Sequence, residues 1–245
     1  MAPIAASGML PVPDVEGVRL PGTCRAGRLV DEVAAIARDP SFTATGILEL
    51  LNRGLFEIAG RVRLPELETS AEVSASPDRA EVRLPADYHR DLLSVTVPAE
   101  RRRVRLYPCL ESLERRFPGL DRTGNVLGAA AGGRSLYYQG VPASPVTLRL
   151  RYYRAPEPLE TESGRVDCLP QHLAASLLVS YACREIFERI EEGADGRKTQ
   201  TERFEARFDA AMRELEAFYG PEYRESDGIA DVMGYGFHEE PWTCV

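Results

Sequence analysis

Two stretches near the start of the chain carry apolar residues at helical spacing. Leu29, Val33 and Ile36 recur at intervals of four and three, which predicts a short helix from Ala26 that Asp39-Pro40-Ser41 ends. A longer helix is predicted over 43–62. Its apolar stripe is formed by Ile47, Leu48, Leu51, Leu55, Ile58 and Val62, with charged residues off the stripe.

After Pro65 the spacing of apolar residues falls to about two, which is typical of half-buried strands. The predicted strands cover residues 71–74, 80–84, 93–97, 101–106, 125–130, 134–139 and 146–153, with a short helix over 110–117. Gly132-Gly133 and Gly140-Val141-Pro142 supply residues suited to turns between them. We therefore expect an antiparallel β-sandwich or small barrel.

The helical period returns in the last third of the chain. Leu169-Pro170 opens one long helix, because proline is well tolerated in a first turn. A second helix is predicted over 198–219, and Gly220-Pro221 closes it. Its apolar side is formed by Phe204, Phe208, Met212, Leu215 and Phe218.

Four amphipathic helices can bury their stripes only against one another, and this sets the predicted plan. The fold class is α+β: a four-helix bundle of two N-terminal and two C-terminal helices, with an inserted antiparallel β-sandwich or barrel and extended termini. We expect an N-terminal arm at 1–25, bundle segments at 26–64 and 156–220, a β-module at 65–155 and a C-terminal tail at 221–245.

Charge is unevenly distributed along the chain. Residues 1–155 carry 21 basic and 18 acidic side chains, whereas residues 156–245 carry 9 basic and 20 acidic ones. Affinity for nucleic acid comes mainly from neutralising phosphates, so the acidic part argues against a conventional nucleic-acid binder. An acidic lining would instead repel DNA and let it slide.

The sequence predicts neither membrane insertion nor secretion. No stretch approaches the roughly 18 to 20 apolar residues that span a bilayer, and the opening residues lack the basic start and apolar block of a secretory signal. We expect the protein to be made in the cytoplasm.

The strongest enzyme-like pattern is Gly128–Ser135, which has the spacing of a phosphate-binding loop with Arg134 in place of the required lysine. A strand is predicted after it, whereas a working loop leads into a helix. Cys168 and His172 could share a helical face as metal ligands, but no second pair accompanies them. We expect no catalytic residue, no cofactor and no metal site.

One basic cluster is a candidate contact surface. Arg101, Arg102, Arg103 and Arg105 lie together without interleaved aromatic residues that could stack on bases. We expect them to contact an acidic surface on a neighbouring subunit or a tail protein, with DNA contact as the alternative.

The last 24 residues show no regular period but contain isolated large apolar side chains. Such a tail is typical of a segment that docks on a partner, and large aromatic residues anchor interfaces. The candidate interface residues are Ile229, Val232, Met233, Tyr235, Phe237 and Trp242.

Several segments, in their order and spacing, resemble a known family. They are Leu50–Gly60, Val82–Arg90, Val146–Leu159, Leu169–Leu173 and the closing helical hairpin. Over residues 27–220 the chain resembles the portal-to-tail adaptors of tailed bacteriophages.

The resemblance implies a structural virion protein of the phage neck that forms a ring, commonly of twelve copies. It implies docking on the portal, connection of the capsid to the tail and a lining for double-stranded DNA, which passes without sequence-specific binding. The implied partners are further copies of the chain, the portal and the next tail or neck protein, and the C-terminal candidate residues become a portal interface. Two alternatives stay open: a non-catalytic interaction module of a cellular protein, or a nucleotide-binding enzyme that uses Gly128–Ser135.

Overall fold

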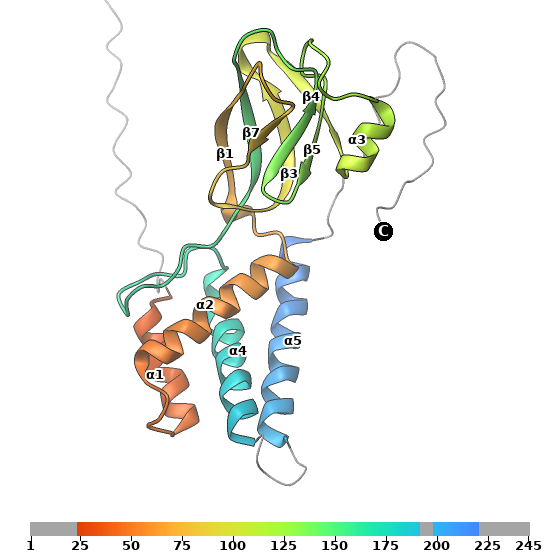
Figure 1. The fold of residues 1–245 in the computed structure, drawn as a ribbon. Helices are drawn as coiled ribbons and strands as arrows, with labels where there is room; N and C mark the ends of the chain where they lie inside the picture. Colours follow the sequence, from red (N-terminus) through yellow and green to blue (C-terminus); the bar gives the residue numbers. More distant parts are fainter. Residues whose placement is uncertain (1–23, 192–197, 221–245) are drawn as a thin grey trace, which may run out of the picture.

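A computed structural model describes residues 24–191 and 198–220 (Figure 1). The helices are α1 (Ala26–Ala37), α2 (Ala44–Arg61), α3 (Leu110–Arg116), α4 (Gln171–Glu191) and α5 (Thr199–Tyr219), with short 3-10 turns η1 (Pro65–Leu67) and η2 (Pro98–Glu100). The strands are β1 (Glu68–Ala75), β2 (Glu81–Arg83), β3 (Tyr88–Val97), β4 (Arg102–Tyr107), β5 (Gly128–Gly132), β6 (Ser135–Gln139) and β7 (Val146–Arg154). In Figure 1 the sheet and α3 lie above the helical part, formed by α1, α2, α4 and α5.

Local interactions explain where α1 ends and where α2 begins. Arg38 takes a left-handed backbone conformation (φ 52°) and ends α1, and its N–H donates to the carbonyl of Ala34. Thr43 caps α2, since its hydroxyl oxygen accepts a hydrogen bond from the N–H of Gly46 at 3.2 Å. The pattern of apolar residues placed both helices within two residues of these bounds.

The helical part is arranged around α4. This helix packs against α1, α2 and α5, and α5 runs back alongside it. In Figure 1, α2 runs obliquely across α4, which differs from the nearly parallel axes of a regular four-helix bundle. The crossing is close because it is built on Gly54, where an added Cβ would lie 2.9 Å from Cδ1 of Tyr181.

The segment between β7 and α4 is held against α1 and α2. Asn52 on α2 makes two hydrogen bonds with Leu159, in which its side-chain nitrogen donates to the carbonyl at 3.1 Å and its oxygen accepts from the N–H at 2.7 Å. Further along, the N–H of Ala26 donates to the carbonyl of Gly164 at 2.9 Å. This connection therefore has a fixed path although it contains no regular element.

The strands form a single sheet in the order β1-β7-β3-β4-β5-β6-β2. All neighbours are antiparallel except β4 and β5, which are parallel, so the expectation of a purely antiparallel module was wrong at this pair. Parallel neighbours need a long crossover connection. Here residues 108–127, which include α3, supply it.

The sheet curls until its end strands β1 and β2 approach each other, giving a nearly closed barrel. The molecule has two separate apolar cores, one among the helices and one inside the barrel. Inward residues of β7 illustrate the second core, since Leu148, Leu150 and Tyr152 are at most 1% exposed. Among the described helices, none is long and apolar enough to span a membrane.

Candidate interaction surfaces

The glycine-rich segment Gly128–Ser135 is part of the sheet. Residues Gly128–Gly132 form β5, and Gly133 (φ 59°) makes the turn into β6. An added Cβ at Gly128 would lie 2.9 Å from the ring of Tyr107 and 3.0 Å from that of Phe117, so glycine serves close packing here. Because β5 pairs with β4 and β6 and leads into a strand, this segment lacks the loop and helix that hold phosphates. The nucleotide-binding alternative is therefore wrong on this geometry.

Cys168 and His172 lie in different surroundings. Cys168 is packed beside Glu66, and burial is the main reason that the pKa of its thiol is raised to about 11. His172 is exposed, with its ring 5.2 Å from that of Phe218. Over residues 24–191 and 198–220, no group of three or more potential ligands could hold a metal ion.

A shallow hollow of about 180 Å³ lies between the start of α2 and the end of α4. Small-molecule sites are usually about 300 to 1,000 Å³ and mostly apolar. Its lining includes Phe42, Glu49, Arg53 and Arg189. The hollow is too small and too polar to suggest a substrate site.

The arginine cluster lies on the turn between β3 and β4 and along β4. Val104 is buried, so its strand neighbours Arg103 and Arg105 project outward, and Arg101 is exposed on the turn at φ 51°. The Arg105 guanidinium lies 5.5 Å from the ring centre of Tyr107. Three of the four predicted residues therefore share an exposed surface.

Arg102 has a different environment. Its guanidinium forms an ion pair with Glu100 at 2.8 Å and donates to the carbonyl of Val126. Strand alternation places Arg102 on the same side as buried Val104, so it is tied to its own chain. Strand alternation over residues 102–106 of the sequence could have predicted that Arg102 faces the other side of the strand from Arg103 and Arg105.

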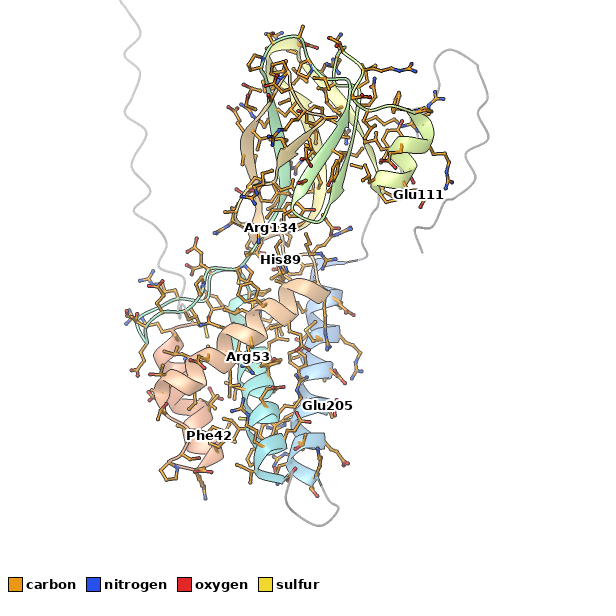
Figure 2. The ribbon with its side chains drawn as sticks, viewed as in Figure 1. Phe42, Arg53, His89, Glu111, Arg134 and Glu205 are labelled. Carbon is orange, nitrogen blue, oxygen red and sulfur yellow. The ribbon has the colours of Figure 1, made fainter. Side chains whose placement is uncertain are left out.

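A third surface is the exposed side of α5, which was not singled out from the sequence. Glu202, Glu205, Asp209 and Glu216 recur at intervals of three, four and seven and are all exposed. They make no ion pair with another described residue, whereas Arg203 and Arg207 lie over the ring of Phe204 on a different side of the helix. Figure 2 shows Glu205 on the opposite side of the helical part from Phe42. Arg213 is also exposed and lies on the same side of the helix between Asp209 and Glu216, so the row is a predominantly negative surface on an outer helix.

The helical part and the sheet meet at the end of α2. Arg90 on β3 donates to the carbonyls of Gly60 at 2.7 Å and Ala59 at 3.3 Å, which lie in the last turn of α2. Its Nε also lies 3.1 Å from Oδ2 of Asp91, which Arg63 contacts at 2.8 Å. Burial acts to raise the pKa of Asp91, but Arg63 and Arg90 outweigh it and hold the pKa below its ordinary value.

His89 lies at the same junction (Figure 2). Its ring meets that of Phe56 edge to face at 6.0 Å, and its Nε2 is buried without a hydrogen-bond partner among the described residues. Burial, followed by the charge of Arg90, lowers the pKa of His89. The junction is thus built from polar groups of β3 against the end of α2, which no local sequence pattern marks.

The predicted C-terminal interface residues, 229–242, lie outside the described residues, as does the arm at 1–23. The structure places neither of them.

Comparison with known families identifies the chain. Residues 25–228 match the family described as SU10 adaptor protein, a match that includes every described helix and strand. The chain belongs to this family. SU10 adaptors are phage head-tail adaptors, a structural and non-catalytic type of protein, so the predicted resemblance is confirmed. Membership points to a location in the virion. No curated protein matches the sequence.

Proposed function

We propose that this protein forms a ring in the phage neck, docks on the portal and connects the capsid to the tail. The observation that carries the proposal is the family match across residues 25–228, which covers the helical part and the β-module as one unit. The contacts of Arg90, Asp91 and Arg63 support it, because they tie the two parts together as a connector under load requires.

In this proposal the acidic row of α5 lines the DNA passage. Glu202, Glu205, Asp209 and Glu216 would present a negative surface to the phosphates of DNA. Repulsion at close range keeps DNA from sticking to the wall while it moves. The family match does not indicate which helix faces the passage. The assignment of α5 is supported by its row of exposed carboxylates.

The exposed arginines of β4 are assigned to a contact with an acidic surface of a neighbouring copy or of the tail. Complementary charges favour orientation and assembly rate more than affinity. Replacing Arg101 and Arg103 together with Glu should reduce assembly at low salt, whereas Arg134→Glu, on the exposed β5–β6 turn, should not. Equal behaviour of both variants would remove this surface from the proposal.

The C-terminal tail is assigned to the portal. Its apolar candidates are Ile229, Val232, Met233, Tyr235, Phe237 and Trp242. A chain that stops after Gly220 should keep its fold, because α5 ends at Tyr219, and lose portal binding. Portal binding that survives this truncation would contradict the assignment.

Ring formation is tested by the mass of the purified protein in solution, measured by light scattering across a range of concentrations. Twelve chains of 27.1 kDa would give about 325 kDa. A closed species that does not grow with concentration supports a ring. A species that keeps growing with concentration indicates an open assembly and contradicts it.

A further inference from the structure

The barrel is open along one line, between β1 and β2. One edge of β1 is paired with β7 over all eight residues, while no described strand pairs with its other edge. The exposure of the inward side chains is consistent with this opening. The inward residues Ala71 and Val73 of β1 and Val82 of β2 are only partly buried. Their neighbours Leu148 and Leu150 on β7 and Leu136 on β6 are fully buried.

The opening has a definite extent. Ala75, at the end of β1 where the chain turns toward β2, is completely buried. β2 itself has only three residues and pairs only with β6. β2 lies close to part of β1 without pairing with it, so among the described strands the outer edge of β1 keeps unpaired backbone groups. The partly buried Ala71 and Val73 form the apolar floor of this partly open seam.

A sequence repeat points to what covers this seam. The tetrapeptide Val-Arg-Leu-Pro occurs three times, at residues 18–21, 62–65 and 82–85. The second and third copies lie in the described structure, whereas the first lies in the arm outside it.

Both described copies place valine and leucine against an apolar core, although the first copy begins at the C-cap of α2 and the second lies in β2. In the copy at 62–65, Val62 and Leu64 have extended backbones (φ −116° and −95°) and are buried, and Pro65 starts η1. In the copy at 82–85, Val82 and Arg83 belong to β2, and the N–H of Leu84 continues the pairing by donating to Arg134 at 2.9 Å. In each case valine and leucine turn toward an apolar core, and proline ends the extended run.

We propose that the arm segment Val18–Pro21 binds as an extra strand along the free edge of β1 in the open seam. Val18 and Leu20 would cover Ala71 and Val73, and Arg19 would face solvent, as Arg83 does in β2. Pro21 ends the strand before the chain enters the helical part at Cys24. An added strand satisfies the unpaired backbone groups of an edge that would otherwise invite non-specific pairing. The proposal does not depend on ring formation.

Hydrogen exchange of the full-length chain tests this directly. The double variant Val18→Asp and Leu20→Asp should exchange the edge amides of β1 at least about tenfold faster than the unaltered protein, because those amides lose their partner. The matched control Ile4→Asp and Val12→Asp makes the same chemical change elsewhere in the arm and should leave β1 exchange unaltered. Equal β1 exchange in all three proteins would overturn the proposal, as would equal acceleration by the control.

A second measurement does not depend on the variant's stability. A benzophenone photo-crosslinker placed at position 20 should attach to residues within β1 or β2 when the full-length protein is irradiated and digested. Attachment confined to other elements would contradict binding at the seam, whatever the mass of the assembly.

Discussion

The helical part and the β-module bury their apolar residues to different degrees. In the helical part α4 is surrounded by three helices, and ten of its residues are buried. In the β-module β7 is paired on both edges, but the inward residues Ala71 and Val73 of β1 stay partly exposed. The helical part thus surrounds its central helix with its own elements, whereas the β-module leaves one edge of β1 unpaired among the described strands. Substitutions in the first should therefore act on stability, and substitutions at the second on contacts.

The largest expected effect lies in the helical core. Phe208 on α5 is fully buried, contacts the ring of Tyr181 and lies beneath the guanidinium groups of Arg61 and Arg184. Phe208→Ala should lower the free energy of unfolding by about 3 to 5 kcal/mol, because it leaves a cavity. Phe218→Ala, at a residue 56% exposed on the same helix with ring contacts to His172 and Tyr219, should lower it by only about 1 kcal/mol or less. Urea unfolding measures both, and similar losses would contradict the packing described.

A smaller effect is expected at the crossing of α2 and α4. Gly54→Ala should cost about 1 to 3 kcal/mol, because the new methyl group would collide with Tyr181. Gly60→Ala, in the same helix with open space around it, should be neutral or stabilise by up to about 1 kcal/mol. Thermal unfolding of the pair gives the comparison, and a stabilising Gly54→Ala would show that the helices do not cross this closely.

The junction between the two parts should contribute less, and in a pH-dependent way. The pKa of Asp91 is lower in the folded chain than its ordinary value, so its contribution is present above that ordinary value and is lost as the pH falls through the folded pKa. Asp91→Asn suits the left-handed backbone there (φ 46°) and removes only the charge. We expect a loss of about 1 to 2 kcal/mol at pH 7 that vanishes in strong acid. A loss that stays constant with pH would contradict the ion pairs with Arg63 and Arg90.

The smallest effect is expected at His89. Its pKa is lowered by burial, so the unfolded chain takes up a proton first as the pH falls, and stability declines below about pH 6.5. His89→Phe keeps a ring beside Phe56 and should flatten the stability profile between pH 7 and 5 by less than about 1 kcal/mol. An unchanged slope in the variant would show that another group titrates there.

The helices could be predicted from the sequence because their signals are local. Apolar spacing, the Thr43 cap and the Gly220 stop act within a few residues, and α2 and α5 begin and end within one residue of the predicted bounds. Alternation also located the strands, but with less accurate bounds: β3 is Tyr88–Val97 where 93–97 was predicted, and β5 is Gly128–Gly132 where 125–130 was predicted. Of the predicted arginine cluster, Arg101, Arg103 and Arg105 are exposed, and their contact with a partner stays a prediction.

The remaining features depend on residues far apart in the chain. The parallel pairing of β4 with β5 depends on the path of the connecting residues 108–127. The sequence of neither strand indicates whether its neighbour runs parallel or antiparallel. The contact of Arg90 with the end of α2, and that of Asn52 with Leu159, join residues 30 and 107 positions apart. The close approach of α2 to α4 at Gly54 depends on Tyr181, which is distant in the chain, and a regular apolar stripe does not reveal it.

The central claim, that this SU10 adaptor joins the portal to the tail, is tested most directly by mixing the purified full-length chain with a purified portal ring. The mass of the mixture can be measured by light scattering after gel filtration. The account predicts a single complex whose mass exceeds that of the portal by a fixed whole number of 27.1 kDa chains, unchanged when more adaptor is added. Portal and chain that elute separately at their own masses, at every ratio, would contradict it.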